Sequence, residues 1–360
     1  MNVLFFSRGR GKGHAIPDIS IVQAVQKVND EVNCNFVSYG TGAATLSEFG
    51  YGVEDLHLPE DNPFLETLVR SCDVIRTSAP DVVVSHEEFA AILAAKVCGV
   101  PAVFITDWFG NEQQLAMQLL TYAELTIFLG ERGIFDEPTF LKGKVAYVGA
   151  FTRDFAYHIR DRDRARLELG ISADVIVVSV LPGGWATEQR APIFDLLIPA
   201  FQGLKIQRKL LCWVAGDEFE QMAGRTKTMS DILVLKNPWP IEQLVVASDL
   251  VVTKGNRITI MESAALGVPS VSLSHGLNPV EDFIVPRIKS NLALRVKGVN
   301  AEFLSKCFHD MLNCEKSQQE DCCGSHGVGL VAGVLLETVV RLGHHGTSPA
   351  NLGDLVTTDV

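Results

Sequence analysis

The chain has 360 residues, 47% hydrophobic and 21% charged, with 31 Lys and Arg against 43 Asp and Glu and a net charge of −12. This length predicts two domains with separate cores, and the composition excludes a wholly disordered chain. The acidic balance argues against a general nucleic-acid binder, which needs a broad basic face, but it permits a small anionic ligand held by a local basic loop or helix end.

Short β-branched runs alternate along the chain with longer segments of helical period. Strands are predicted at 3–7, 34–38, 81–85, 102–105 and 125–128, and again at 175–180, 210–214, 232–235, 250–253 and 270–273. Near-continuous apolar strands are typical of a parallel sheet covered on both faces. The repeated strand–helix order therefore predicts an α/β protein with two Rossmann-like halves.

The domain boundary is expected near residues 148–153, where a predicted strand ends before a charged helical segment. We expect a first domain at 1–150 and a second at 151–343, whose last packed helix would cover 329–342. The segment 344–360 is rich in His, Gly, Ser and Pro and is expected to be a flexible tail.

The sequence shows no sign of secretion or of a membrane span. The first apolar residues are followed at once by Arg8, unlike a secretory signal, and no run reaches the roughly 20 apolar residues of a spanning helix. The eight cysteines are not needed as a disulfide framework in a chain of this length, and the cysteines of 307–323 with His326 match no standard zinc spacing. We expect a reduced, soluble, cytoplasmic protein without a metal, for which peripheral membrane contact remains open.

The first predicted strand runs into the glycine-rich loop Ser7-Arg8-Gly9-Arg10-Gly11-Lys12-Gly13-His14. Alternating glycines let the backbone turn sharply and approach a ligand, and the start of the following helix offers N–H groups suited to an anion. Arg8, Arg10 and Lys12 add three positive charges within five residues to the partial positive charge of the helix start. The spacing matches neither the G-x-G-x-x-G fingerprint nor the P-loop, which disfavours an NAD site.

His14 lies where this loop becomes a helix, at the carboxyl edge of the first strand, where open α/β sheets bind their ligands. A neutral imidazole there can take a proton from a hydroxyl or a water. A histidine that caps the helix or bonds a backbone carbonyl explains the position equally well. His86 and Asp107 follow two other strands and could orient or replace His14, although a structural role in these loops is the plainer explanation.

Two more loops in the second half follow strands and precede helices. Pro182-Gly183-Gly184 is the first, and Thr253-Lys254-Gly255-Asn256-Arg257 is the second, with Asn256 a natural N-cap. A cation in the first helical turn opposes the helix dipole, so Arg257 suggests a bound anion. A structural turn is the simpler explanation of the Pro182-Gly183-Gly184 loop.

Thr259 and Glu262 are three residues apart and share a face of the helix that follows Arg257. The carboxylate of Glu262 could accept hydrogen bonds from a pair of ribose hydroxyls. A solvated or salt-bridged glutamate is the simpler alternative.

Together, Gly9–His14, the Pro-Gly-Gly loop and the segment from Asp249 to Pro269, with its Thr-x-x-Glu and Ala-Leu-Gly-Val-Pro, resemble the GT-B glycosyltransferases. The likeness is strongest to the UDP-N-acetylglucosamine-dependent transferases of peptidoglycan lipid II and to macrolide-type glycosyltransferases. It covers residues 1–288. It implies two Rossmann-like domains facing each other across a cleft, with the donor on the second and the acceptor on the first.

The resemblance also implies roles for individual residues. Glu262 would bind the ribose of a uridine nucleotide, and His14 would be the base facing the acceptor. No metal is needed in this family, because a helix dipole acts at the leaving diphosphate. The remaining donor-binding residues would be Gly183, Gly184, Ile241, Gly255, Asn256, Arg257 and Thr259.

The chain departs from the family pattern at three places. The family's Asp-Gln or Gln-Gln is replaced in the stretch 274–282, where Asn278, Glu281 or Asp282 would serve instead, so the donor sugar stays open. Gly255-Asn256 replaces the usual Ser-Gly. The basic residues of the first loop are unusual and suggest additional negative charge on a substrate. The residues assigned to the acceptor side are Arg8, Arg10, Lys12, Gly13, His86 and Asp107.

The sequence therefore predicts a metal-independent, inverting transferase that moves a hexosyl or N-acetylhexosaminyl group from a UDP-sugar to a hydroxyl acceptor. The nucleotide-sugar is a substrate, and no cofactor is expected. Two alternatives remain: a nucleotide-sugar hydrolase or epimerase on the same fold, and a non-catalytic nucleotide-sugar-binding protein. The acceptor and the oligomeric state are not predicted.

Overall fold

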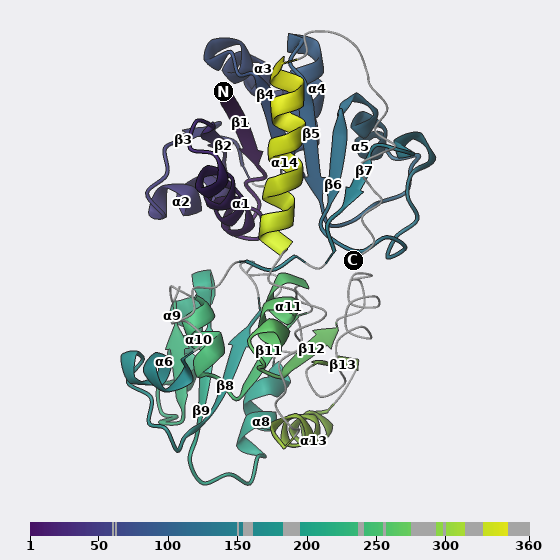
Figure 1. Cartoon of the computed structure of the whole chain (residues 1–360). Helices are drawn as coiled ribbons and strands as arrows, with labels where there is room; N and C mark the ends of the chain where they lie inside the picture. The colour runs from purple at the N-terminus through teal and green to yellow at the C-terminus, as the bar shows by residue number, and fades with distance from the viewer. Residues whose placement is uncertain are drawn as a thin grey trace. The chain divides into compact units, whose positions relative to one another are not determined.

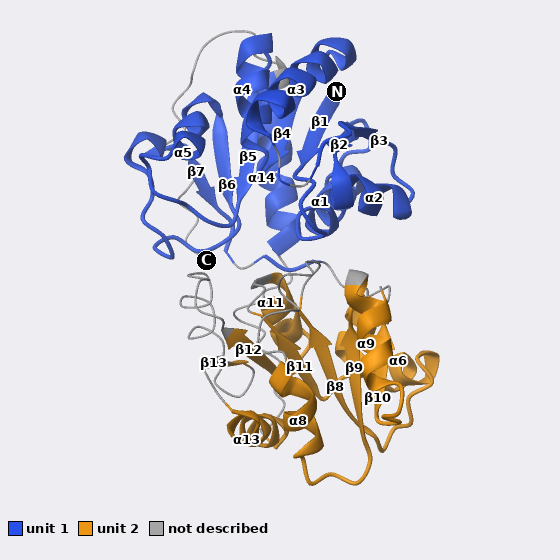
Figure 2. Ribbon diagram, turned by 180° about the vertical axis from the view of Figure 1, so that it is seen from behind, with its two compact units in different colours: residues 1–154, 326–360 blue, residues 155–325 orange. Residues whose placement is uncertain are grey.

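The computed structural model describes residues 1–59, 61, 63–149, 151–153, 161–182, 195–236, 241–254, 257–274, 293–297, 300–313 and 327–344. The chain divides into two compact units, shown in Figure 2. Unit 1 is Met1–Asp154 with His326–Val360, and unit 2 is Phe155–Ser325. No helix in the described ranges is long and apolar enough to cross a membrane.

Unit 1 contains a seven-stranded parallel sheet in the order β3-β2-β1-β4-β5-β6-β7 (Figure 1). Its strands are β1 (Asn2–Ser7), β2 (Asn33–Ser38), β3 (Val53–Asp55), β4 (Val82–His86), β5 (Ala102–Thr106), β6 (Leu125–Phe128) and β7 (Val145–Tyr147). The chain runs outward from β1 to β3 and then returns to β4 beside β1. In this register Ser7 pairs with His86, so the residues that follow β1 and β4 leave the sheet side by side.

Helices cover both faces of this sheet. They are α1 (Ala15–Val28), α2 (Gly40–Glu48), α3 (Phe64–Ser78), α4 (Phe89–Cys98), α5 (Leu115–Leu119) and α14 (Gly327–His344), with short 3₁₀ turns at Leu120–Tyr122 and Thr139–Leu141. Successive strand residues alternate between the faces: Phe5 packs with α1 and α14, whereas Phe6 packs in the cluster that includes Ile92 of α4. Both aromatic side chains are buried, which explains the near-continuous apolar pattern of the strands.

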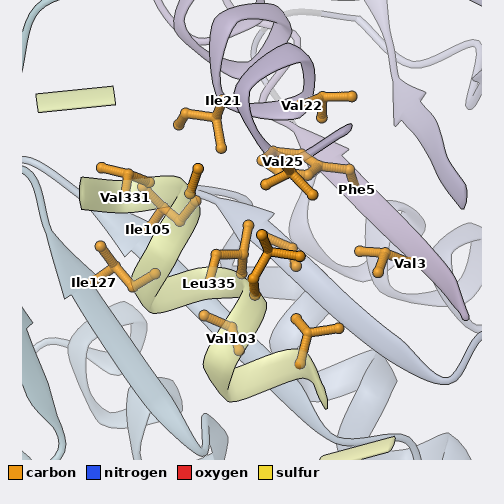
Figure 3. Packing of buried hydrophobic residues seen from close by; sticks show 14 of the residues in the cluster. Val3, Phe5, Ile21, Val22, Val25, Val103, Ile105, Ile127, Val331 and Leu335 are labelled. Carbon is orange, nitrogen blue, oxygen red and sulfur yellow. The ribbon is translucent and has the colours of Figure 1, made fainter. Parts of the chain in front are cut away.

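The position of α14 corrects the expected domain division. The prediction placed this helix in the second domain, but its buried Val331 and Leu335 pack in the unit 1 core with Val3, Ile105 and neighbouring side chains (Figure 3). The apolar repeat of the helix predicts that one face is buried. It carries no information about which of two similar sheets covers that face.

Unit 2 contains a six-stranded parallel sheet in the order β10-β9-β8-β11-β12-β13. Its strands are β8 (Ile176–Leu181), β9 (Lys209–Val214), β10 (Ile232–Leu235), β11 (Leu250–Thr253), β12 (Ser270–Ser274) and β13 (Ala293–Lys297). The described helices are α6 (Arg162–Glu168), α8 (Leu197–Gln202), α9 (Phe219–Thr226), α10 (Ile241–Ala247), α11 (Arg257–Ala265) and α13 (Ala301–Leu312), with a 3₁₀ turn at Gly216–Glu218. The strand order again reverses between the first and fourth strands, as in a doubly wound Rossmann-like sheet.

All ten predicted strands are present, so the α/β prediction is confirmed. The structure adds three strands that are not among these ten: β7, which ends just before the expected domain boundary, and β3 and β13, which the apolar pattern did not reveal. A cluster around Asp249 ties α6 to the start of β11: the carboxylate pairs with Arg162 and with Arg166, and it accepts a bond from the Val177 N–H at 2.9 Å.

Candidate active site

The glycine-rich loop after β1 is held in place by close packing against the residues that follow β2. A Cβ atom on Gly9 would lie 2.2 Å from the carbonyl oxygen of Tyr39 and 2.5 Å from its Cδ2, so no other residue fits without movement of the loop. The Gly42 N–H donates to the Gly9 carbonyl at 3.0 Å, and the Arg8 N–H donates to the His86 carbonyl at 3.3 Å. The loop is thereby fixed between α2 and the end of β4.

His14 precedes α1 and faces the end of β4. Among the described residues its side chain makes no capping bond to the helix. Instead, Nε2 lies 3.0 Å from Oε2 of Glu87. A carboxylate only accepts hydrogen bonds, so Nε2 carries the proton and the lone pair of the neutral ring lies on Nδ1. Nδ1 is buried and has no hydrogen-bond partner within the described part of the chain.

Glu87 is held in an unusual backbone conformation directly after β4. Its φ is +57°, a left-handed value that is uncommon for a residue with a side chain and often marks a functional position. The carboxylate is 7% exposed, accepts a bond from the Thr106 hydroxyl at 2.8 Å, and lies 3.8 Å from the Arg8 guanidinium. Burial alone would raise the pKa of Glu87. The hydrogen bond of His14, the positive charge that the His14 ring carries when it is protonated, the charge of His86 and the Thr106 bond lower this pKa to about 2.

A second pair of a carboxylate and an imidazole, Asp18 and His86, lies next to the His14–Glu87 pair. Asp18 is one helical turn after His14, and its Oδ1 is 2.5 Å from Nδ1 of His86, the residue before Glu87. Burial disfavours a charged His86, but the charge and bond of Asp18, with smaller contributions from Glu87 and Asp107, raise the pKa of this histidine. The rings of His14 and His86 meet edge to face, with centroids 4.8 Å apart and planes at 79°.

The structure thus brings together three of the predicted residues, Arg8, His14 and His86. It adds Glu87, Asp18 and Thr106, to which the sequence analysis gave no role. Asp18 could have been suspected from its spacing of four from His14, which places both on one face of a helix. Glu87 follows His86 at a strand end, but its left-handed backbone was not visible in the sequence.

The other predicted acceptor-side residues have varied surroundings. Lys12 pairs with Glu48 at 3.3 Å, and the guanidinium of Arg8 is partly buried with an unpartnered Nε within the described part of the chain. Arg10 and Gly13 are exposed, and a Cβ on Gly13 would meet nothing within 4 Å. Asp107 follows β5, close enough to influence His86 electrostatically. Their roles toward an acceptor stay predictions.

In unit 2, Glu262 lies on α11, the helix that follows β11. Glu262 is only 6% exposed, which excludes a solvated surface position. Thr259 and Ile241, the first residue of α10, are partly buried, and Arg257 begins α11. The other predicted donor residues lie outside the described residues: Gly183, Gly184, Gly255, Asn256, Asn278 and Glu281. The donor-binding roles stay predictions.

No protein-family model matches the chain. A glycosyltransferase of Methanopyrus kandleri, named as uncharacterized, is 26% identical over 226 residues, which are 60% of this chain and 62% of that protein. The UDP-N-acetylglucosamine–N-acetylmuramyl-(pentapeptide) pyrophosphoryl-undecaprenol N-acetylglucosamine transferase of Ruminiclostridium cellulolyticum is 23% identical over 296 residues, 75% of this chain and 78% of that protein.

Solved structures match almost the whole chain. The glycotransferase of kitacinnamycin has a TM-score of 0.66 at 16% identity, covering 95% of each chain. The UDP-GlcNAc 2-epimerase of Neisseria meningitidis, solved with UDP-GlcNAc bound, has a TM-score of 0.61 at 15% identity, covering 95% of this chain and 100% of that one. At such identities the matches establish the fold. The chain is therefore an α/β protein of the GT-B fold, built from two Rossmann-like units, and it resembles the GT-B glycosyltransferases.

Proposed function

We propose that the protein transfers a sugar from a UDP-sugar to a hydroxyl acceptor, with inversion and without a metal, and that His14 is the base. One observation carries the proposal: the His14–Glu87 pair lies where β1 and β4 end side by side. This is the point at which the strand order reverses and where open α/β sheets bind ligands. The glycosyltransferase names of the sequence relatives support the reaction class.

The pair is suited to remove a proton from a hydroxyl. Glu87 holds the Nε2–H of His14, which leaves Nδ1 as the nitrogen that receives the acceptor proton. Nδ1 is buried in this structure, so the side chains that cover it must move for the acceptor hydroxyl to reach it. The hydroxyl oxygen then bonds to the anomeric carbon, while the bond from that carbon to UDP breaks and UDP leaves with the electron pair. The carboxylate of Glu87 stabilises the imidazolium that forms. General-base catalysis of this kind contributes about 10²–10⁴-fold.

On the donor side, the proposal assigns the ribose to Glu262. A carboxylate on the helix after β11 offers two acceptors to the two ribose hydroxyls, and its burial means that it is already partly desolvated. That a protein of the same fold binds UDP-GlcNAc supports a UDP-sugar as the donor.

Calorimetric titration with UDP, ADP and dTDP tests the donor. We expect UDP to bind most tightly, and Glu262→Gln to weaken UDP binding, whereas Glu220→Gln, an exposed glutamate on α9, leaves it unchanged. Equal binding of the three nucleotides would refute the uridine assignment.

Turnover of the His14→Gln variant tests the base. Glutamine keeps a donor for Glu87 but cannot accept the proton, so we expect turnover to fall about 10²–10⁴-fold while UDP affinity is unchanged. A variant that keeps more than about a tenth of the turnover would refute the role of His14.

An epimerase on this fold is the second candidate, because the UDP-GlcNAc 2-epimerase of Neisseria meningitidis matches the chain over 95% of its length. Proton NMR of UDP-GlcNAc incubated with the protein, in the absence of any acceptor, separates the candidates. A transferase leaves the nucleotide-sugar intact under these conditions. Formation of its C2 epimer would establish the epimerase, and release of UDP at the full turnover rate would establish a hydrolase.

A further inference from the structure

The Asp18–His86 pair has no part in the chemistry proposed above, yet it contacts the candidate base. The two side chains are 0% and 4% exposed, so neither is placed to contact a substrate. They join α1 to the end of β4 through a bond of 2.5 Å between Oδ1 of Asp18 and Nδ1 of His86. Any contribution to catalysis must therefore act through a neighbour.

Stability by itself is a weak explanation for this pair. A buried ion pair loses its hydration, and well-packed apolar residues of similar volume are often at least as stable in its place. Moreover, Oδ2 of Asp18 is buried without a hydrogen-bond partner among the described residues. A buried polar group left partly unsatisfied is destabilising, which is the opposite of what a purely stabilising pair requires.

The contacts of His86 indicate that it acts on the neighbouring pair, His14 and Glu87. Its ring meets the His14 ring edge to face at 4.8 Å, and its charge helps to hold the pKa of Glu87 low. The other charged group that acts on it is Asp107 at the end of β5, while the backbone of Arg8 donates to the His86 carbonyl. His86 therefore contacts the base itself and acts electrostatically on the carboxylate that the base bonds.

Two hydrogen-bonded pairs join the start of α1 to the end of β4, and each pair consists of one carboxylate and one imidazole. His14 directly precedes α1 and Asp18 lies one turn later on that helix, whereas His86 is the last residue of β4 and Glu87 follows it. His14 bonds Glu87, and Asp18 bonds His86. Neither ring can rotate freely, because each is bonded to a carboxylate and packed against the other ring.

We propose that Asp18 and His86 are positioning residues, which hold the His14 ring in the orientation that places Nε2 against Glu87. This inference rests on the proposed function of His14, because a fixed ring matters only if the ring acts on a substrate. A displacement of about 1 Å at a reacting group can lower turnover about 10²-fold. The pair would thus act on kcat and leave donor binding unchanged.

Two substitutions separate the parts of this proposal. His86→Asn keeps a short N–H donor toward Asp18 but removes the ring that packs against His14. Asp18→Asn keeps the shape of the side chain but removes its charge, so it provides a second test if the first variant does not fold. Tyr39→Phe is the control, because it deletes a buried bond of 2.9 Å to the carboxylate of Glu88, next to Glu87, and keeps the ring that packs on Gly9. Within the described part of the chain, Tyr39 has no hydrogen bond to His14 or His86.

Turnover of UDP-GlcNAc or another UDP-sugar substrate is the first readout, with folding checked by circular dichroism. We expect kcat to fall about 10-fold to 100-fold in His86→Asn and Asp18→Asn, with KM for the UDP-sugar within about twofold of wild type. Tyr39→Phe should retain wild-type turnover. A folded His86→Asn variant with unchanged kcat, or a loss that appears only in KM, would overturn the proposal.

Nitrogen-15 NMR of the imidazole rings is the second readout and needs no substrate. In the wild-type protein, neutral His14 should exist as the single tautomer protonated at Nε2, as its bond to Glu87 requires. In His86→Asn we expect a mixture of the two tautomers, and in Tyr39→Phe the wild-type spectrum. If these spectra change as expected but no UDP-sugar is turned over, the proposed function fails and the positioning pair stands. If His14→Gln abolishes turnover while His86→Asn leaves turnover and spectra unchanged, the proposed role of His14 stands and the positioning role of Asp18 and His86 fails.

Discussion

Replacing Leu335 by alanine should destabilise unit 1 and leave unit 2 unchanged. Leu335 lies on α14, which follows unit 2 in sequence but packs in the core of unit 1 with Val3 and Ile105. Its side chain is 2% exposed. The substitution removes buried carbon atoms and leaves a cavity between the helix and the sheet.

The expected loss is about 2–5 kcal/mol, the range observed when a fully buried leucine is truncated to alanine. Leu330 on the same helix provides the matched control, since it is 46% exposed. Leu330→Ala makes the same chemical change and alters helix propensity equally, but should change the free energy of unfolding by only about 0.5 kcal/mol.

Hydrogen exchange followed by mass spectrometry assigns the loss to a unit. Peptides from β1 and β4 report on unit 1, and peptides from β8 and β11 report on unit 2. Slowly exchanging amides of β1 and β4 should exchange at least about 30-fold faster in Leu335→Ala, because each 1.4 kcal/mol corresponds to a factor of ten. Exchange in β8 and β11 should not change.

Two results would refute this reasoning. Faster exchange in β8 and β11 but not in β1 and β4 would mean that α14 packs on unit 2, as the sequence analysis expected. A loss no larger than that of Leu330→Ala would mean that the buried face of the helix is not the one described.

Three further predictions follow from particular contacts. Gly9→Ala should lower turnover about 10²-fold, because its Cβ would lie 2.2 Å from the Tyr39 carbonyl oxygen and displace the loop, whereas Gly52→Ala, whose Cβ meets nothing within 4 Å, should not; steady-state kinetics checks both. Asp249→Ala should destabilise unit 2 by about 3–5 kcal/mol, because Arg162 and Arg166 lose the carboxylate that they share. Urea unfolding, with hydrogen exchange in β8 as the probe of unit 2, measures this loss. The pKa of Glu87 is lowered from 4.5 to about 2, so its ionised form contributes about 3 kcal/mol above pH 4.5, and this is lost as the pH falls toward 2. The difference in unfolding free energy between wild type and Glu87→Gln should therefore shrink as the pH falls below 4.5; a constant difference down to about pH 3 would contradict this.

The strands were predictable because their signal is local. Consecutive apolar residues fill most of β1, from Val3 to Phe6, and of β11, from Leu250 to Val252, as burial on both faces of a parallel sheet requires. The glycine-rich loop after β1 was predictable for the same reason, since its conformational demands fall on consecutive residues. The short strand β3 lacks such a run, with only Val53 apolar, and was missed.

The pairing within the candidate site was not predictable in this way. His14 and Glu87 are 73 residues apart, and Asp18 and His86 are 68 apart. Periodicity shows that His14 and Asp18 share a helix face, but it does not show which strand end lies opposite. That depends on β4 returning to the side of β1, a consequence of strand order.

The amino-acid sequence alone determined the α/β class, the two repeated halves and the loop that carries His14. Each of these features depends on neighbouring residues, whose burial and backbone preferences are local. Only the tertiary structure decided that Glu87 bonds His14, that Asp18 bonds His86, and that α14 completes unit 1. These are contacts between segments distant in sequence, and an apolar or charged side chain does not specify its partner until the chain has packed.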